Sequence, residues 1–180
     1  YENEFEAAYV AYPNIPKGIL EGVSFVQTRF TNIDHSEPGC IGLPTVQGVM
    51  GLTIDGQGYF NNTLSVIAEH SNTPLDEMGN PATDIMAYAK VYNDFVLENS
   101  MPSNDFSAHE TILREMSEIP QDGNEVNNYA LASFTYAVFQ FMRDEENQAI
   151  YNLPAHPIDL ESIYGEQNLK ILSSKKVQIS

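Results

Sequence analysis

Apolar residues recur at helical spacing along most of the chain. In residues 16–30 the apolar positions Ile19, Val23, Val26 and Phe30 fall on one face of a helix, which is expected to be buried. Residues 126–142 are apolar on nearly every side, a pattern typical of a helix in the middle of a bundle. Further helices are predicted at residues 5–12, 61–70, 74–78, 81–97 and 106–119. The pattern therefore predicts a mainly α-helical fold.

Two stretches lack this periodicity. Residues 31–58 are rich in Gly, Pro and Asp and predict a loop that is long for a compact domain; such loops are usually functional or disordered. After Asp144 the apolar residues lose helical spacing, Pro154 and Pro157 interrupt the segment, and its end is polar. We therefore expect one helical domain over residues 1–144, followed by a C-terminal extension or linker over residues 145–180.

The composition narrows the choice of partners. The chain has 180 residues, 42% of them hydrophobic, which suffices for one core, and no apolar run approaches the roughly 20 residues that span a bilayer. With 25 acidic and 8 basic residues the net charge is −17, which repels nucleic acid and anionic lipid. We expect a neutral or cationic partner, no nucleic-acid binding and no transmembrane segment.

Other reactive groups give little indication of chemistry. The one cysteine of the sequence, Cys40, is expected to be buried or to pair with a cysteine outside this segment. The chain begins at Tyr1 without a charged or apolar leader, which is typical of a mature or trimmed secreted product. No zinc, nucleotide or serine-hydrolase motif is present, so no metal or cofactor is predicted. The histidines are scattered along the sequence at His35, His70, His109 and His156.

Two short motifs carry the strongest signal. The helix at residues 16–30 ends in Gln27-Thr28-Arg29-Phe30, and the following loop contains Gly48-Val49-Met50-Gly51-Leu52. The pair resembles the lysozyme-like domain of soluble lytic transglycosylases and goose-type lysozymes. In that family the helix ends in Glu-Ser-x-Phe, where the Glu is the catalytic acid, and a Gly-x-x-Gly-Leu-Met-Gln loop lines the sugar groove.

The resemblance continues in two later helices. Residues 81–92, Pro-Ala-Thr-Asp-Ile-Met-Ala-Tyr-Ala-Lys-Val-Tyr, are similar to the family's Pro-x-x-Asn-Ile-x-x-Gly-x-x-Tyr-Leu. Residues 130–136, Ala-Leu-Ala-Ser-Phe-Thr-Tyr, resemble its closing helix, Ala-Leu-Ala-Ala-Tyr-Asn-Ala-Gly. The four motifs occur in the family's order, and the resemblance implies a lysozyme-like helical domain with a long groove-lining loop.

The departures from the family pattern fall on its chemistry. Gln27 stands at the position of the acid, and Ile54 stands at that of the last Gln of the loop motif. A carboxylic acid can give a proton to a departing glycosidic oxygen, whereas a carboxamide cannot. The resemblance therefore implies a catalytically silent groove that can still hold glycan. The implied substrate-binding residues are Gln27, Thr28, Met50, Gly51, Leu52, Phe134 and Thr135.

No catalytic residue is assigned, but two alternative acids are open. Glu21 lies about 120° from Gln27 around the helix, so a solvated surface position is the expected one. Asp55 could project toward the groove, although an Asp-Gly turn explains it without function. Surface positions are also predicted for Glu69, Glu110 and Glu115. Four tyrosines could supply stacking faces for sugars, but at helical spacing most of them are expected to be core residues; they are Tyr88, Tyr92, Tyr129 and Tyr136.

The amino-acid sequence of residues 15–25 and 42–53 further resembles that of the module that precedes an N-acetylmuramoyl-L-alanine amidase domain in some secreted bacterial wall hydrolases. This resemblance implies a secreted or periplasmic location, a peptidoglycan glycan strand as the partner, and an amidase domain downstream in the same chain. Two alternatives stay open. One is an active muramidase or lytic transglycosylase that uses a displaced acid, and the other is a protein-interaction module with a closed groove.

Overall fold

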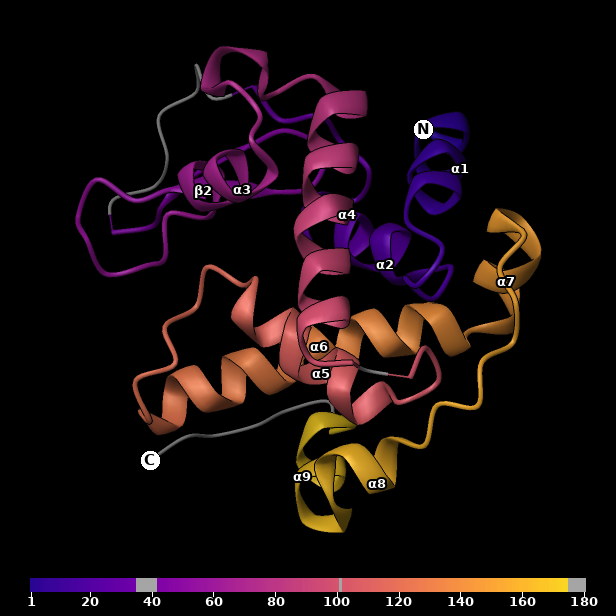
Figure 1. The fold of residues 1–180 in the computed structure, drawn as a ribbon. Coiled ribbons are helices and arrows are strands. Elements are labelled where there is room, and N and C mark those ends of the chain that lie inside the picture. Colours follow the sequence, from indigo (N-terminus) through magenta and orange to yellow (C-terminus); the bar gives the residue numbers. More distant parts are fainter. Residues whose placement is uncertain (35–41, 101, 175–180) are drawn as a thin grey trace.

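The computed structural model describes residues 1–34, 42–100 and 102–174, so that His35 and Cys40 lie outside the described residues. Figure 1 shows the arrangement of the elements. The longer helices are α1 (Glu2–Ala11), α2 (Ile19–Thr28), α3 (Thr63–Ser71), α4 (Pro81–Glu98), α5 (Phe106–Glu115) and α6 (Glu125–Arg143). The shorter elements are β1 (Thr45–Gln47), β2 (Leu52–Ile54), the 3-10 turn η1 (Leu75–Glu77), α7 (Glu145–Tyr151), α8 (Leu160–Tyr164) and α9 (Glu166–Leu172).

The predicted mainly helical fold is confirmed, and α2 packs on α6 as the central contact of the core. A Cβ atom added to Gly22 would lie 2.9 Å from Cγ1 of Val138, so the two helices meet with almost no space between them. Gly18, the residue directly before α2, faces Met142. The two helices therefore run antiparallel, and α4 crosses α6 at a steep angle (Figure 1).

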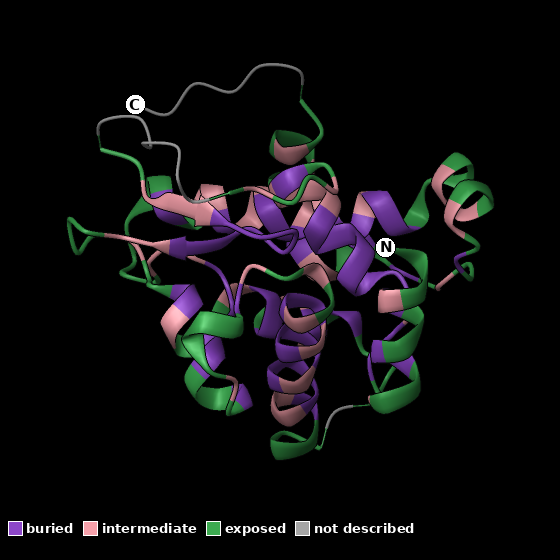
Figure 2. Cartoon of the chain, turned by 90° about the horizontal axis from the view of Figure 1, so that it is seen from above, coloured by how far each residue is buried: buried purple, intermediate pink, exposed green. Residues whose placement is uncertain are grey.

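Burial follows this arrangement. The inward sides of α2, α4 and α6 are buried, while exposed residues gather at the outer turns and at the ends of the molecule (Figure 2). Tyr88 and Tyr92 of α4 have exposed fractions of 2% and 0%, which confirms that these tyrosines belong to the core. Among the described residues, no helix combines the length and apolar character that crossing a bilayer requires.

The predicted loop at residues 31–58 contains a small hairpin. Strands β1 and β2 pair antiparallel, with Thr45 opposite Ile54 and Gln47 opposite Leu52. The turn between them uses Gly48 at φ 75° and Gly51 at φ 67°, a backbone region that favours glycine. The periodicity did not predict this hairpin, because three-residue strands are too short to show an alternating pattern.

The described part of the predicted C-terminal extension or linker, residues 145–174, is folded and packed against the rest of the chain. It forms α7, α8 and α9, and its side chains Leu153, Ile158, Leu160 and Tyr164 are buried in the core. Two of these side chains lie on the five-residue α8, and the other two lie in the extended, proline-containing segment before it. Stretches this short give too little helical periodicity to be recognised in the sequence.

Candidate functional site

The end of α2 lies directly against the turn of the hairpin, so the two strongest sequence motifs meet in space. Ser24 and Thr28 both donate hydrogen bonds from their hydroxyls to the carbonyl oxygen of Val49, at 2.9 and 2.8 Å. A Cβ atom on Gly51 would lie 2.6 Å from Cβ of Gln27. The glycine at position 51 is therefore what allows Gln27 to lie flat against the turn.

A carboxylate faces Gln27 at this junction. The Gln27 amide donates a hydrogen bond from Nε2 to Oε2 of Glu118 at 3.0 Å, and the Ser117 hydroxyl donates to the same oxygen at 3.3 Å. Both Gln27 and Glu118 are half-buried. Burial raises the pKa of Tyr88, and the negative charge of Glu118 raises it further.

Sequence reasoning missed Glu118. It lies in the connection between α5 and α6, 91 residues from its partner, in a segment without a motif. The backbone N–H of Asn61 donates to the Glu118 carbonyl at 2.8 Å, and the Asn61 amide donates to the carbonyl of Ser117 at 2.9 Å. These contacts fix the connection beside the hairpin, and only the tertiary structure reveals them.

The residues implied to bind substrate are mostly buried. Gln27 is half-buried, and Gly51 is buried under it. The other side chains have exposed fractions of 8% or less, and these are Thr28, Met50, Leu52, Phe134 and Thr135. Gln27 and Glu118 are the polar groups of this junction that keep partial access to solvent.

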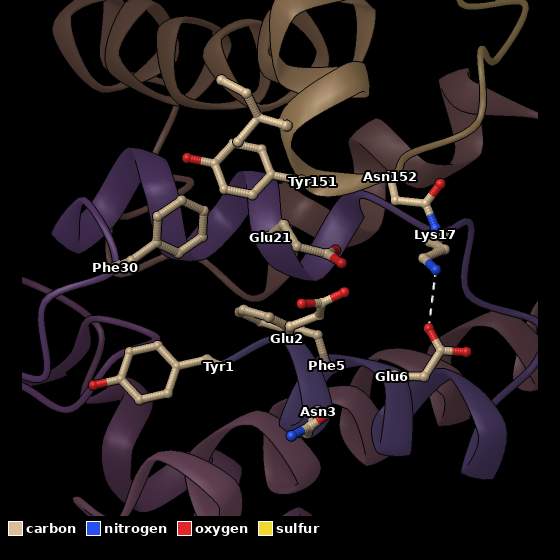
Figure 3. A pocket seen from close by; sticks show the side chains of 11 residues that line it. Tyr1, Glu2, Asn3, Phe5, Glu6, Lys17, Glu21, Phe30, Tyr151 and Asn152 are labelled. Atoms are coloured by element: carbon tan, nitrogen blue, oxygen red, sulfur yellow. Dashed lines mark hydrogen bonds and ion pairs between the residues drawn. The ribbon is translucent and has the colours of Figure 1, made fainter.

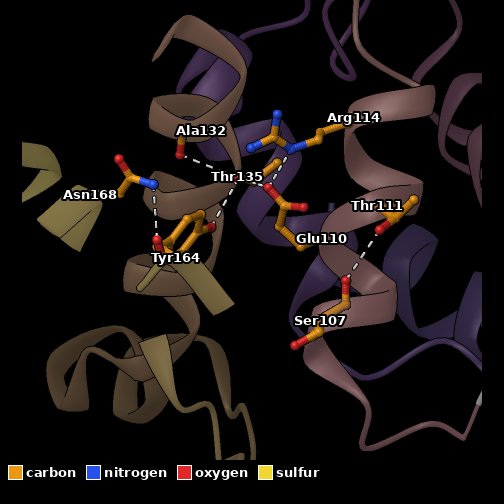
Figure 4. A network of polar contacts seen from close by, with 8 residues as sticks. All are labelled: Ser107, Glu110, Thr111, Arg114, Ala132, Thr135, Tyr164 and Asn168. Carbon is orange, nitrogen blue, oxygen red and sulfur yellow. Dashed lines mark hydrogen bonds and ion pairs between the residues drawn. The ribbon is translucent and has the colours of Figure 1, made fainter. Parts of the chain in front are cut away.

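Thr135 is turned toward α5 and α8, where it joins a polar network (Figure 4). Its hydroxyl donates to Glu110 Oε1 at 3.1 Å and accepts a hydrogen bond from the Tyr164 hydroxyl at 2.9 Å. Arg114 Nε donates to the same Glu110 oxygen at 2.5 Å. The prediction of a surface position is wrong for Glu110, whose side chain is 12% exposed, because α6 and α8 cover it. Glu69 and Glu115 are exposed, as predicted.

Asp55 acts as a turn residue. Its carboxylate accepts hydrogen bonds from the backbone N–H groups of Gln57 at 2.8 Å and Tyr59 at 2.6 Å, and from that of Phe60. These bonds stabilise the charged form and lower the pKa of Asp55. A general acid must carry a proton that it can donate, whereas these bonds hold Asp55 in its deprotonated form.

Glu21 differs from the sequence prediction. Glu21 was expected on a solvated side of its helix, but its exposed fraction is 6% because α1 covers that side of α2. The hydroxyl of Tyr9 donates to Oε2 of Glu21, and burial raises the pKa of this carboxyl. Glu21 lies at the wall of a cavity of about 570 Å³ (Figure 3). Two further cavities, of about 460 and 390 Å³, lie beside α4, and Gln27 lines none of the three.

Comparison of the chain with protein families, curated proteins and solved structures finds no match. The functional argument therefore depends on the sequence motifs and on the geometry of the two sites. At the first site a carboxamide and a carboxylate share a hydrogen bond, and both can exchange it for bonds to a sugar hydroxyl. At the second site a buried carboxyl faces a cavity.

Proposed function

We propose that this chain is a lysozyme-like, peptidoglycan-facing domain that binds a glycan strand at Gln27 and Glu118 without cleaving it. The observation that carries the proposal is the hydrogen bond from Gln27 to Glu118 at 3.0 Å. At the position of the family's acid, a carboxamide is paired with a carboxylate. The amide has no proton to transfer, yet together the two groups offer donors and acceptors that suit sugar hydroxyls.

The setting of the pair supports this proposal. Gln27 lies on α2 and packs against Gly51 of the hairpin turn. The contacts of Asn61 hold the connection that carries Glu118. The acidic chain repels polyanions but not a glycan backbone. By the resemblance described above, the domain belongs to a secreted or periplasmic wall hydrolase and positions a downstream amidase on its substrate.

Binding to purified peptidoglycan sacculi tests the proposal. The wild-type chain should sediment with sacculi and release no muropeptides above a buffer control. Gln27→Ala and Glu118→Gln should each weaken sedimentation, whereas Glu69→Gln, which removes an exposed charge from α3, should leave it unchanged. No sedimentation of the folded wild-type chain would overturn the proposal and favour the protein-interaction alternative.

A working muramidase is the second candidate, and the structure supplies an acid for it other than the two that the sequence suggested. The carboxyl of Glu118 lies 3.0 Å from the Gln27 amide, so it reaches the same place from another element. Release of muropeptides that Glu118→Gln abolishes, and that Glu21→Gln leaves intact, would establish this candidate. It would also identify Glu118 as the proton donor.

A further inference from the structure

A cavity of about 570 Å³ lies between α1, the start of α2 and the end of α7 (Figure 3). Its volume is within the range of small-molecule sites in proteins. Gln27 and Glu118 do not line it. Any ligand of this cavity is therefore independent of the proposed glycan site.

Two carboxylates point into the cavity. Glu21 reaches it from α2 and Glu2 from α1, and their carboxyl groups are directed toward each other (Figure 3). Two cations lie at the cavity and pair with other carboxylates: Lys17 with Glu6 at 2.9 Å, and the amino group of Tyr1 with Glu4 at 3.9 Å. Among the described residues neither Glu2 nor Glu21 forms an ion pair with a side chain. The carboxyl groups of Glu2 and Glu21 thus face the cavity without an ion pair of their own, and the charge of Lys17 acts on Glu21 only from a distance.

The burial of Glu21 makes its negative charge costly. Glu21 is 6% exposed, and its side-chain hydrogen-bond donor is the neutral hydroxyl of Tyr9. A buried carboxylate is stabilised most effectively by a cation that also donates hydrogen bonds to it. A positively charged ligand in the cavity would supply both.

Aromatic rings form the other wall. The ring centroids of Phe30 and Tyr151 lie 5.3 Å apart, and those of Phe5 and Phe30 lie 6.3 Å apart. Phe30 has φ 60°, a backbone conformation that is costly for a bulky residue and that recurs at ligand sites. This conformation directs the Phe30 ring to the cavity beside Tyr151 (Figure 3). Aromatic faces attract cations and also accommodate apolar stems.

We propose that this cavity binds a primary alkylammonium group, of the kind that ends a lysine side chain. The ammonium lies between Glu2 and Glu21, and its apolar stem lies against Phe30 and Tyr151. A primary ammonium has three N–H donors for the two carboxylates. A quaternary ammonium has none and would leave the buried Glu21 oxygen without a donor from the ligand.

An NMR titration of the ¹⁵N-labelled chain tests the site with three probes: n-pentylamine, 1-pentanol and tetramethylammonium. Pentylamine should produce saturable shifts that are centred on the backbone amides of residues 2–6, 17–21 and 150–152. Pentanol and tetramethylammonium should bind at least about tenfold more weakly, because each lacks the charge or the N–H donors. Equal binding of pentanol and pentylamine would overturn the proposal, as would shifts that are centred elsewhere.

Charge-neutral variants identify the ligands of the ammonium. Glu21→Gln and Glu2→Gln should each weaken pentylamine binding by about tenfold or more, since each removes a charge-assisted hydrogen bond. Glu69→Gln is the matched control, because it changes the net charge equally from an exposed position on α3. Glu2 is exposed in the first turn of α1, so Glu2→Gln tests the site even if Glu21→Gln does not fold. Unchanged affinity in Glu2→Gln and in folded Glu21→Gln would exclude the site.

Discussion

Gly48 and Asp84 come from two different sequence motifs, yet a Cβ atom on Gly48 would lie 1.9 Å from Oδ2 of Asp84. The Asp84 side chain is fully buried at the start of α4, and its Oδ1 accepts a hydrogen bond from the backbone N–H of Gly79 at 2.8 Å. The hairpin turn thus packs directly against a carboxyl group at the start of α4. The space for that group exists because position 48 has no side chain.

We therefore expect Gly48→Ala to destabilise the fold strongly. The substitution places a methyl group on a buried carboxylate and also imposes alanine on a φ of 75°, so the loss should be about 3 kcal/mol or more. Gly58→Ala is the control, since Gly58 has the same φ of 75° with nothing within 4 Å of an added Cβ. It should cost about 1 to 2 kcal/mol in urea unfolding. Equal losses in the two variants would show that the contact with Asp84 is unimportant.

Asp84 should also make stability depend on pH. Burial raises its pKa from 3.8 to about 6, against the opposing effect of the backbone amides of Gly79 and Val49. Because the folded state holds the proton more tightly, this contribution to stability is complete below the unfolded pKa. It is lost as the pH rises through about 6. Asp84→Asn removes this dependence, so its free energy of unfolding relative to wild type should rise by about 2 to 3 kcal/mol between pH 4 and pH 7.

Urea unfolding of both proteins across this pH range measures the difference. Asp94→Asn is the control, because Asp94 is a solvent-accessible residue of the same helix that pairs with Lys90 at 2.7 Å. The free energy of unfolding of Asp94→Asn relative to wild type should not rise between pH 4 and pH 7. A constant difference between Asp84→Asn and wild type from pH 4 to pH 7 would contradict a raised pKa for Asp84.

The sequence predicts the helices whose buried residues recur at helical spacing. It does not predict features that depend on single contacts between residues far apart in the sequence. The helices that contain Val23, Tyr92 and Val138 are recognisable because each buries several residues at helical spacing. The meeting of α2 with the glycine turn was suggested by the family resemblance. Periodicity cannot show that α1 covers Glu21 or that the chain brings Glu118 to α2, since both are tertiary contacts between elements far apart in the sequence.

Tyr9 shows how one such contact organises a site. Its hydroxyl accepts hydrogen bonds from the backbone N–H groups of Gly18 at 2.9 Å and Leu20 at 3.1 Å, while it donates to Glu21. It therefore caps the start of α2, where no side chain of the helix itself does so. Tyr9→Phe leaves two amides and a carboxyl without this partner and should cost about 2 to 4 kcal/mol.

Thermal and urea unfolding measure this loss. Tyr12→Phe is the comparison, because it also removes a tyrosine hydroxyl, from a half-buried residue directly after the end of α1. It should cost less than about 1 kcal/mol. If Tyr9→Phe were as stable as Tyr12→Phe, the Tyr9 hydroxyl could not be the cap of α2.

Gln27→Glu tests the geometry of the proposed glycan site most directly. The substitution introduces the acid that stands at this position in the resembled family, and it places the new carboxyl beside that of Glu118, where the amide now donates at 3.0 Å. Two carboxylates at this distance cannot both ionise readily, so the pair should share a proton and one apparent pKa should rise well above the ordinary Glu value of about 4.3. An NMR titration of the side-chain carboxyls measures this pKa. In Gln27→Glu combined with Glu118→Gln the neighbouring charge is gone, so the pKa of the introduced carboxyl should fall back toward the ordinary value. An unshifted pKa in the single variant would mean that the two side chains do not meet in solution.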